Sequence, residues 1–197
     1  MRADSPFSNW HEVVAQFFEN PRSVKIAGGS VRGSTDHFIV ARAIQLAGGD
    51  PRKVVYIPYD GGGKALAGIL TGETQVLSTG LSEAINMARA GKVRILAITA
   101  GHRLIDAPEL PTLKEMGIDL EFANWRGFFA APGLPPLQYQ KMMVTVSDVV
   151  ASDAFETVRA RNGWSRLHLE GKEFYDYLEA QEQEIGALMR DLGFLRN

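Results

Sequence analysis

The sequence predicts an α/β fold that is built around a parallel sheet. Short β-branched runs alternate with segments of helical period along the N-terminal half of the chain, which is the pattern of βαβ units. Loops rich in Gly, Ser and Thr follow the predicted strands. The 197 residues are 45% hydrophobic and 22% charged, as in folded globular chains, so a mainly disordered or collagen-like protein is excluded.

The N-terminal half predicts one helix followed by alternating strands and helices. Ser8 is a suitable N-cap, apolar residues then recur at three- and four-residue spacing, and Asn20-Pro21 ends this first helix. We expect strands at 24–27, 54–59, 75–78 and 93–99, and helices at 36–47, 64–70 and 81–90.

The alternation ends near residue 100, and the C-terminal half predicts mainly helices. A Pro-rich loop at 108–112 opens a short helix that ends at Gly117, and an aromatic, extended stretch covers 120–131. Further helices are expected at 136–151, 153–162 and 172–192. We therefore expect three parts: an N-terminal helix at 1–21, a complete α/β ligand-binding lobe at 22–124, and a crossover strand with C-terminal helices at 125–197.

Charge and residue counts exclude several classes of function. The 23 acidic and 21 basic residues give a formal net charge of -2, so no overall basic field attracts nucleic acid or an anionic membrane. The chain has no cysteine, which excludes disulfides, iron–sulfur clusters, zinc thiolate sites and cysteine nucleophiles. The sequence shows neither a secretory signal, with its apolar run of about 7–15 residues, nor a membrane span.

Three strand-to-helix turns carry the residues best suited to binding a ligand. They span 28–35, 60–63 and 78–82. In an open parallel sheet such turns lie at the carboxyl ends of the strands, where ligands bind. Free N–H groups at a helix start attract anions, Gly permits close backbone approach, and hydroxyls add donors. We therefore expect a cradle for a carboxylate or phosphate, although Gly and Ser are also ordinary turn and cap residues.

Two further side chains are candidates for this cradle. His37, in the first turn of its helix, could donate to an anionic ligand or simply pack at the helix start. Arg126, at the composition boundary near 124–132, could clamp a carboxylate bidentately or form a structural salt bridge. Asp36 is expected to compensate the helix dipole, because its charge argues against contact with an anion.

Motifs for nucleotide binding and catalysis are missing. Gly63-Lys64 is followed by Ala65 and lacks the upstream Gly of a P-loop, and no G-x-G-x-x-G fingerprint occurs. The four histidines show no metal-binding spacing, and no G-x-S-x-G is present. We expect no catalytic residues, no metal site and no cofactor. An enzyme acting on a small anionic substrate stays an alternative, because catalytic groups need not be adjacent in sequence.

Several ordered segments resemble the receptors of tripartite tricarboxylate transporters, the TctC or Bug family. Residues 28–37 are similar to the glycine/hydroxyl loop of the family, and residues 56–66 resemble its strand–GGG–helix segment. Further family motifs are matched at 90–99, 108–117, 124–133 and 162–164. The last two segments look like the tricarboxylate-type branch in particular.

The resemblance implies a fold like that of type II periplasmic binding proteins, with two α/β lobes around a cleft. It also implies a periplasmic receptor that captures a small di- or tricarboxylate such as citrate and delivers it to a membrane permease, without chemistry. The expected ligand contacts are Ser30, Gly33, Ser34, Thr35 and His37, and further candidates are Gly61, Gly62, Thr79 and Arg126.

The sequence departs from the family pattern at its start. Family members begin with a signal peptide and the first half of lobe one, whereas this sequence starts where lobe two is about to begin. We therefore expect one complete parallel-sheet lobe, the C-terminal helical part of the other lobe, and half of the ligand clamp. Arg32 adds bulk and charge where the family often has a small residue. Apolar faces left exposed on the C-terminal helices would favour self-association, so an oligomeric interaction module is a second alternative.

Overall fold

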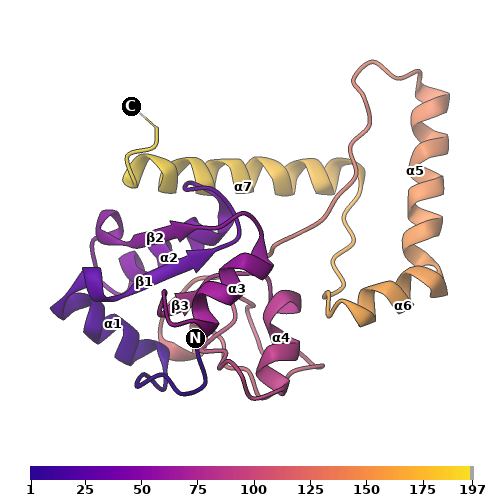
Figure 1. The fold of residues 1–197 in the computed structure, drawn as a ribbon. Helices are drawn as coiled ribbons and strands as arrows, with labels where there is room; N and C mark the ends of the chain where they lie inside the picture. Colours follow the sequence, from indigo (N-terminus) through magenta and orange to yellow (C-terminus); the bar gives the residue numbers. More distant parts are fainter. Residues whose placement is uncertain (196–197) are drawn as a thin grey trace. The chain divides into compact units, whose positions relative to one another are not determined.

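The computed structural model describes residues 1–195 and divides the chain into two compact units. The first unit runs from Met1 to Ala123 and again from His168 onward, and the second is Asn124–Leu167. The first unit holds a three-stranded parallel sheet, with helices α1 to α4 and α7 around it (Figure 1). This division into two units does not test the three parts expected from the sequence, whose boundaries stay a prediction.

The sheet has the order β2-β1-β3, and all of its strands are parallel. The strands are β1 (Lys25–Gly28), β2 (Val55–Pro58) and β3 (Val76–Leu77). Each strand leads into a helix, namely α2 (Thr35–Leu46), α3 (Gly62–Leu70) and α4 (Leu81–Arg89). The predicted α/β fold is therefore confirmed. Because the strands are parallel, the three loops that leave them emerge at the same edge of the sheet.

Alternate residues of the central strand β1 face two separate parts of the core. Ile26 is fully buried in the larger cluster, which includes Phe17 of α1 and Ile44 of α2. Ala27 belongs to a smaller cluster on the other face, where it meets Ile69 of α3. Fully burying a side chain such as Ile26 contributes about 1.5–3 kcal/mol. Apolar side chains therefore pack on both faces of the sheet and fix its position within the first unit.

Helix α1 (Trp10–Glu19) begins one residue later than the sequence predicted. The predicted N-cap, Ser8, is wrong, and Asn9 takes this role because its side-chain oxygen accepts from the Glu12 N–H at 3.0 Å. The Glu12 carboxylate in turn accepts from the Ser8 N–H at 2.6 Å. The arrangement differs from a capping box, because Glu12 accepts from the residue before the N-cap, but it also satisfies two N–H groups.

The predicted strand at 93–99 is not formed and is a wrong expectation. Val93 and Ile98 each make one isolated bridge, the first with Arg2 and the second with Thr112. The reason lies in the neighbours of this segment. Its N-terminal end faces the first residues of the chain and its C-terminal end faces a turn, so no continuous strand lies along it.

The expected C-terminal helices are formed, but the crossover strand expected at the start of 125–197 is not, and two of the 3-10 helices were not predicted. The described 3-10 helices are η1 (Pro21–Ser23), η2 (Pro51–Lys53) and η3 (Lys114–Met116), and the C-terminal helices are α5 (Pro136–Ala151), α6 (Asp153–Arg161) and α7 (Gly171–Asp191). The short helix that was expected to end at Gly117 is η3, and Gly117 closes it with φ 79°. The stretch 120–131 contains neither helix nor strand.

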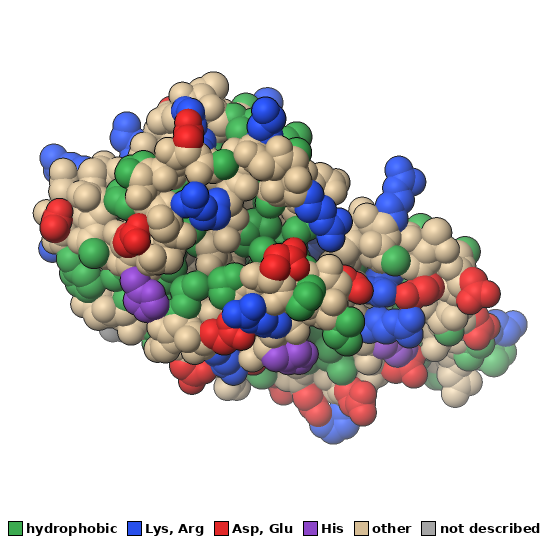
Figure 2. Space-filling model, turned by 90° about the horizontal axis from the view of Figure 1, so that it is seen from below, with side chains coloured by type: hydrophobic (Ala, Val, Ile, Leu, Met, Phe, Trp, Pro, Cys, Tyr) green, Lys and Arg blue, Asp and Glu red, His purple; other side chains and the backbone are tan. Residues whose placement is uncertain are grey.

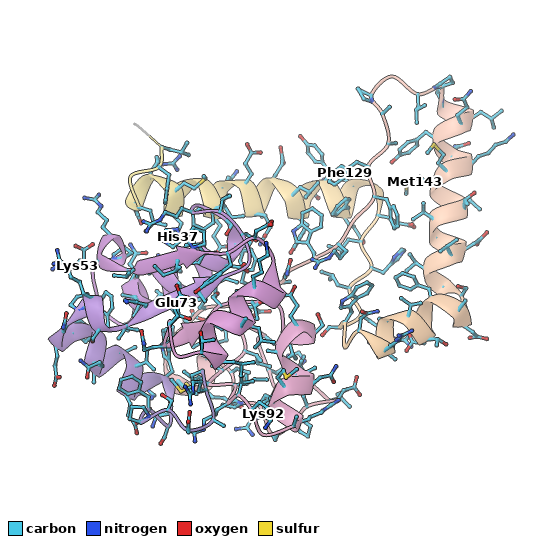
Figure 3. The ribbon with its side chains drawn as sticks, viewed as in Figure 1. His37, Lys53, Glu73, Lys92, Phe129 and Met143 are labelled. Carbon is cyan, nitrogen blue, oxygen red and sulfur yellow. The ribbon has the colours of Figure 1, made fainter. Side chains whose placement is uncertain are left out.

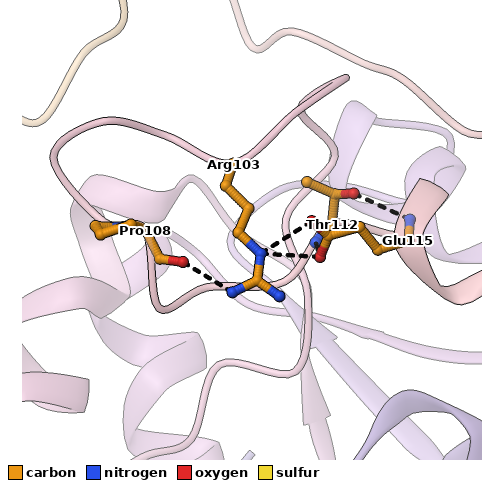
Figure 4. A network of polar contacts seen from close by, with 4 residues as sticks. All are labelled: Arg103, Pro108, Thr112 and Glu115. Carbon is orange, nitrogen blue, oxygen red and sulfur yellow. Dashed lines mark hydrogen bonds and ion pairs between the residues drawn. The ribbon is translucent and has the colours of Figure 1, made fainter.

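A polar network stabilises the turn before η3 (Figure 4). The Arg103 guanidinium binds the Glu115 carboxylate at 2.9 Å and donates to the Pro108 carbonyl at 2.9 Å. The hydroxyl of Thr112, a fully buried residue, accepts from the Glu115 N–H at 3.1 Å. The hydrogen bond from Arg103 and, to a smaller extent, its positive charge hold the pKa of Glu115 below its ordinary value.

The second unit contains α5 and α6, and α5 has no buried residue. Large apolar side chains that are exposed on α5 are Leu137, Tyr139, Met142, Val144 and Val149. Within residues 1–195, no helix has both the length and the apolar character needed to cross a membrane. On the face shown in Figure 2, acidic and basic side chains are interspersed.

Candidate functional site

The loops that follow β1 and β2 contact each other at the carboxyl edge of the sheet. The Tyr59 N–H donates to the Gly28 carbonyl at 2.8 Å, and the Gly61 N–H donates to the Gly29 carbonyl at 2.9 Å. A Cβ at position 29 would lie 2.6 Å from the Gly62 nitrogen, closer than atoms normally approach. Gly29 is therefore required by the close contact of two backbones.

Asp36 lies in the first turn of α2, and its carboxylate accepts from the Gly29 N–H of the loop after β1 at 3.0 Å. Asp36 lies at the helix N-terminus, where the sequence predicted that it compensates the dipole, and its carboxylate also closes the loop. Burial is the largest influence on its pKa and raises it, while the Gly29 hydrogen bond acts in the opposite direction. One backbone N–H of the predicted cradle is thus already used by the protein itself.

His37 is 5% exposed, and Figure 3 shows it between β2 and the C-terminal end of α7. Its Nδ1 accepts from the Gly33 N–H at 3.2 Å. Its ring lies 4.7 Å from the Tyr56 ring and 5.7 Å from the Phe194 ring, between centroids. Burial and, to a smaller extent, the Arg32 charge lower the pKa of His37, so its neutral form is favoured. This placement favours the packing role that the sequence left open.

Tyr56 connects β2 to the loop after β1. Its hydroxyl donates to the Ser30 carbonyl at 2.8 Å, and its own carbonyl accepts from the Arg32 guanidinium at 2.9 Å. The phenol oxygen lies against Gly28, which leaves no room for a side chain at that position. Arg32, which the sequence marked as a departure from the family pattern, thus serves to hold the loop against β2.

Ser34 and Thr35 begin helix α2. Ser34 is the N-cap residue, but its side chain makes no capping hydrogen bond. The Ser34 hydroxyl oxygen is buried beside the Tyr56 phenol and makes no hydrogen bond of normal geometry among the described residues. The part of Ser34 in ligand binding stays a prediction.

The loops after β2 and β3 are joined by a residue that the sequence analysis missed. The Glu83 carboxylate lies against Gly62, since a Cβ at that position would be 2.7 Å from the nearest carboxylate oxygen. The Thr79 hydroxyl donates to the same carboxylate. Two signals in the sequence could have indicated Glu83: it lies in the first turn of a helix, and it is four residues after Thr79.

Helix α3 begins in a backbone conformation that only glycine adopts easily. Gly61 is the N-cap, with φ 99°. A Cβ at Gly61 or at Gly63 would meet no atom within 4 Å, so the space beside these two residues is open. The N–H groups of the first helical turn have no partner within a helix, and together with the helix dipole they favour an anion.

Arg126 belongs to the second unit and contacts its own neighbours in the chain. Its guanidinium donates to the side-chain oxygen of Asn124 at 2.8 Å and to the Trp125 carbonyl at 3.2 Å. Both contacts are with neighbouring residues of the chain. The side-chain partner of Arg126 is the amide of Asn124, so among the described residues Arg126 does not form the salt bridge that was one of the two alternatives. A role for Arg126 in ligand binding stays a prediction.

A small cavity lies away from the three loops, between α2 and α7. Its volume is about 110 Å³, and residues such as Phe38, Leu120 and Leu188 line it. Ligand pockets commonly measure about 300–1,000 Å³, so this apolar cavity is too small for a ligand of that class. Among residues 1–195, no group of three metal-ligating side chains is present. The carboxyl edge of the sheet is therefore the candidate site.

Comparison with known proteins shows the family to which the chain belongs. The family model described as "Tripartite tricarboxylate transporter family receptor" matches residues 1–194. The chain belongs to this family, TctC. A curated relative, the UPF0065 protein in the tcbD-tcbE intergenic region of Pseudomonas sp. (strain P51), is 26% identical over 160 residues, which are 80% of this chain and 46% of the relative.

Solved structures share the fold. An R. palustris protein determined with adipate has a TM-score of 0.83 and 22% identity, and the match covers 98% of this chain and 63% of that one. MatC from Rhodopseudomonas palustris, determined with bound malate, has a TM-score of 0.79 and 21% identity, with 97% and 64% covered. The chain spans about half the length of the curated relatives that it matches.

Proposed function

We propose that this chain is the ligand-binding part of a periplasmic solute receptor in a tripartite tricarboxylate-type transport system. It takes a small di- or tricarboxylate in a cleft between two lobes and delivers it to a membrane permease, without chemistry. The observation that carries the proposal is the meeting of three Gly- and hydroxyl-rich loops at the carboxyl edge of the sheet, in a chain of the TctC family.

The start of α3 is where we propose that a ligand carboxylate binds. No described side chain caps the N-terminus of this helix, and the space that a Cβ at Gly61 or Gly63 would occupy is open. The N–H groups of a first helical turn favour an anion. Ser30, Gly33, Ser34, Thr35 and Thr79 belong to the adjoining loops and would complete the contacts of this lobe. Since this edge is a surface and not an enclosed pocket, a second wall is needed to exclude water from the ligand.

The ligands of two structural neighbours support the choice of a carboxylate. Adipate and malate are both dicarboxylates, and each was determined with a protein that has the same fold as this chain. We extend this chemistry to the present chain and include tricarboxylates, because the family is described as a tricarboxylate transporter receptor. Closure of the cleft around the ligand would signal occupancy to the permease.

The proposal is tested by titrating the chain with malate, adipate and citrate in two-dimensional amide NMR and calorimetry. We expect the amide signals of Gly33, Ser34 and Gly62 to shift in a saturable way. Dimethyl malate, which lacks both negative charges, is the matched control and should leave these signals unchanged. If no acid produces heat or a saturable shift at this edge, the proposed function is wrong.

Self-association is a second proposal, which the exposed apolar residues of α5 favour. A helix of 16 residues without any buried residue leaves its apolar side chains in water. We expect light scattering to show a dimer or larger species, and Met142→Glu with Val149→Glu to reduce its mass to that of one chain. A monomer in the unsubstituted protein at high concentration would contradict this second proposal.

A further inference from the structure

Glu83 places a negative charge beside the proposed binding position for an anion. Its carboxylate contacts Gly62 at the start of α3 and accepts from the Thr79 hydroxyl of the neighbouring loop. Gly62 and Thr79 were both expected to face the ligand. A carboxylate of the protein itself therefore already contacts two residues that the ligand was expected to contact.

A second carboxylate lies close enough to interact with the first. Asp36 accepts from the Gly29 N–H at 3.0 Å, and Gly29 packs directly on Gly62. After the effect of burial, the charge of Glu83 also contributes to the raised pKa of Asp36. The edge thus has two neighbouring acids where the sequence alone predicted hydrogen-bond donors.

The basic groups of these loops are engaged elsewhere. Arg32 donates to the Tyr56 carbonyl at 2.9 Å, and Lys64 forms an ion pair with Asp60 at 3.0 Å. His37 favours its neutral form, because burial lowers its pKa. The carboxylates of Glu83 and Asp36 therefore have no ion-pair partner among the described side chains of these three loops.

We propose that Glu83 is a specificity-determining residue that limits how much negative charge the ligand carries into this lobe. The inference rests on the proposed function, because it assumes that a carboxylate binds at the start of α3. A ligand with three ionised carboxylates is repelled more strongly than one with two. The hydroxyl of a hydroxy acid such as malate also gives Glu83 a donor to accept from.

The magnitude follows from Coulomb's law. Two unit charges about 7 Å apart, at an effective dielectric constant of about 40, repel enough to weaken binding about fivefold to tenfold. Neutralising Glu83 should therefore strengthen malate binding about fivefold, and citrate binding about tenfold or more. The change in the citrate-to-malate affinity ratio on substitution reports the effect of the extra carboxylate, because the difference in size between the two acids is the same for both proteins.

The experiment compares the full chain with Glu83→Gln and with Glu73→Gln. Glu73 is exposed and precedes β3, at the opposite edge of the sheet, so its substitution changes the net charge equally. Malate and citrate affinities are measured by amide NMR at constant ionic strength. We expect Glu83→Gln to strengthen both, citrate more than malate, and Glu73→Gln to change neither.

The ligand-free spectra separate this inference from the proposed function. Removal of the charge should move the Gly62 amide signal in Glu83→Gln but not in Glu73→Gln. An unmoved Gly62 signal overturns the inference whatever the ligand does. If the unsubstituted chain binds the acids and Glu83→Gln binds them equally or more weakly, the inference is overturned. The proposed function is not affected by that result. If neither protein binds any acid, both fail.

Discussion

The Nδ1 atom of His37 accepts a hydrogen bond from the Gly33 N–H, 3.2 Å away. Gly33 has φ 87°, a conformation in which few other residues are stable, so the loop after β1 turns sharply at this point. The His37 ring also stacks at a tilt of 30° on Tyr56 from β2. One buried imidazole therefore holds a glycine turn and joins it to the neighbouring strand.

Replacing His37 should cost stability even when an aromatic ring is kept. In His37→Phe the Gly33 N–H loses its acceptor in a part-buried place, which we expect to lower the free energy of unfolding by about 1–3 kcal/mol. Urea denaturation measures this change. The same substitution at His102, which is exposed, should change stability by less than about 0.5 kcal/mol. Equal stabilities of the two variants would show that the hydrogen bond contributes nothing.

The lowered pKa of His37 predicts a loss of stability in acid. Above pH 6.5 His37 is neutral in both the folded and the unfolded chain and contributes no pH dependence. As the pH falls below 6.5, the unfolded chain takes up the proton first, so the free energy of unfolding decreases. The raised pKa of Asp36 acts in the opposite direction at lower pH.

Unfolding of the unsubstituted chain and of His37→Phe is therefore compared between pH 7.5 and pH 5.5. The contributions of Asp36 and the other three histidines are present in both proteins and cancel in the difference. We expect the unsubstituted chain to lose more stability than the variant over this range. Parallel stability curves would contradict a buried, neutral His37.

Two glycines of the candidate site should respond in opposite ways to alanine. At Gly29 an added Cβ meets the Gly62 backbone at 2.6 Å, so Gly29→Ala forces two loops apart and should destabilise the protein by about 1–3 kcal/mol. At Gly63 nothing lies within 4 Å of the added Cβ. Gly63→Ala should be neutral or stabilise by about 0.4–1 kcal/mol, because the unfolded chain loses freedom.

Thermal unfolding of both glycine variants measures these effects, with the unsubstituted chain as reference. Amide spectra of Gly29→Ala should also show shifts at Gly61 and Gly62, since their backbone must move. If Gly29→Ala unfolds at the same temperature as Gly63→Ala, the close contact of the two loops does not exist in solution.

Thr112→Val tests the polar network before η3. Valine has nearly the shape of threonine but cannot accept from the Glu115 N–H, a hydrogen bond of 3.1 Å in the native turn (Figure 4). We expect a loss of about 1 kcal/mol, and a melting temperature lower by about 2–4 °C. Thr145→Val, on the exposed surface of α5, is the matched control. A similar change in both variants would mean that the Thr112 hydroxyl has no special role.

Local patterns in the sequence were enough to predict much of the fold. Helix α5 has the bounds expected from its proline start and its apolar period, and the loops after β1, β2 and β3 lie where Gly and Ser interrupt the pattern. These features depend on the intrinsic conformational preferences of a few neighbouring residues, so the sequence alone determines them. The family motifs likewise occur as short ordered segments.

Contacts between distant residues decided the rest. Residues 93–99 have the composition of a strand, but strand pairing needs a continuous neighbour, and only isolated bridges form. His37 is buried partly by Phe194, which is far along the chain, and Glu83 reaches Gly62 only because α4 packs beside α3. Burial and electrostatic repulsion depend on which surfaces meet in space. The sequence by itself therefore determined the class of fold and the place of the loops, whereas the tertiary structure decided which charges lie among them.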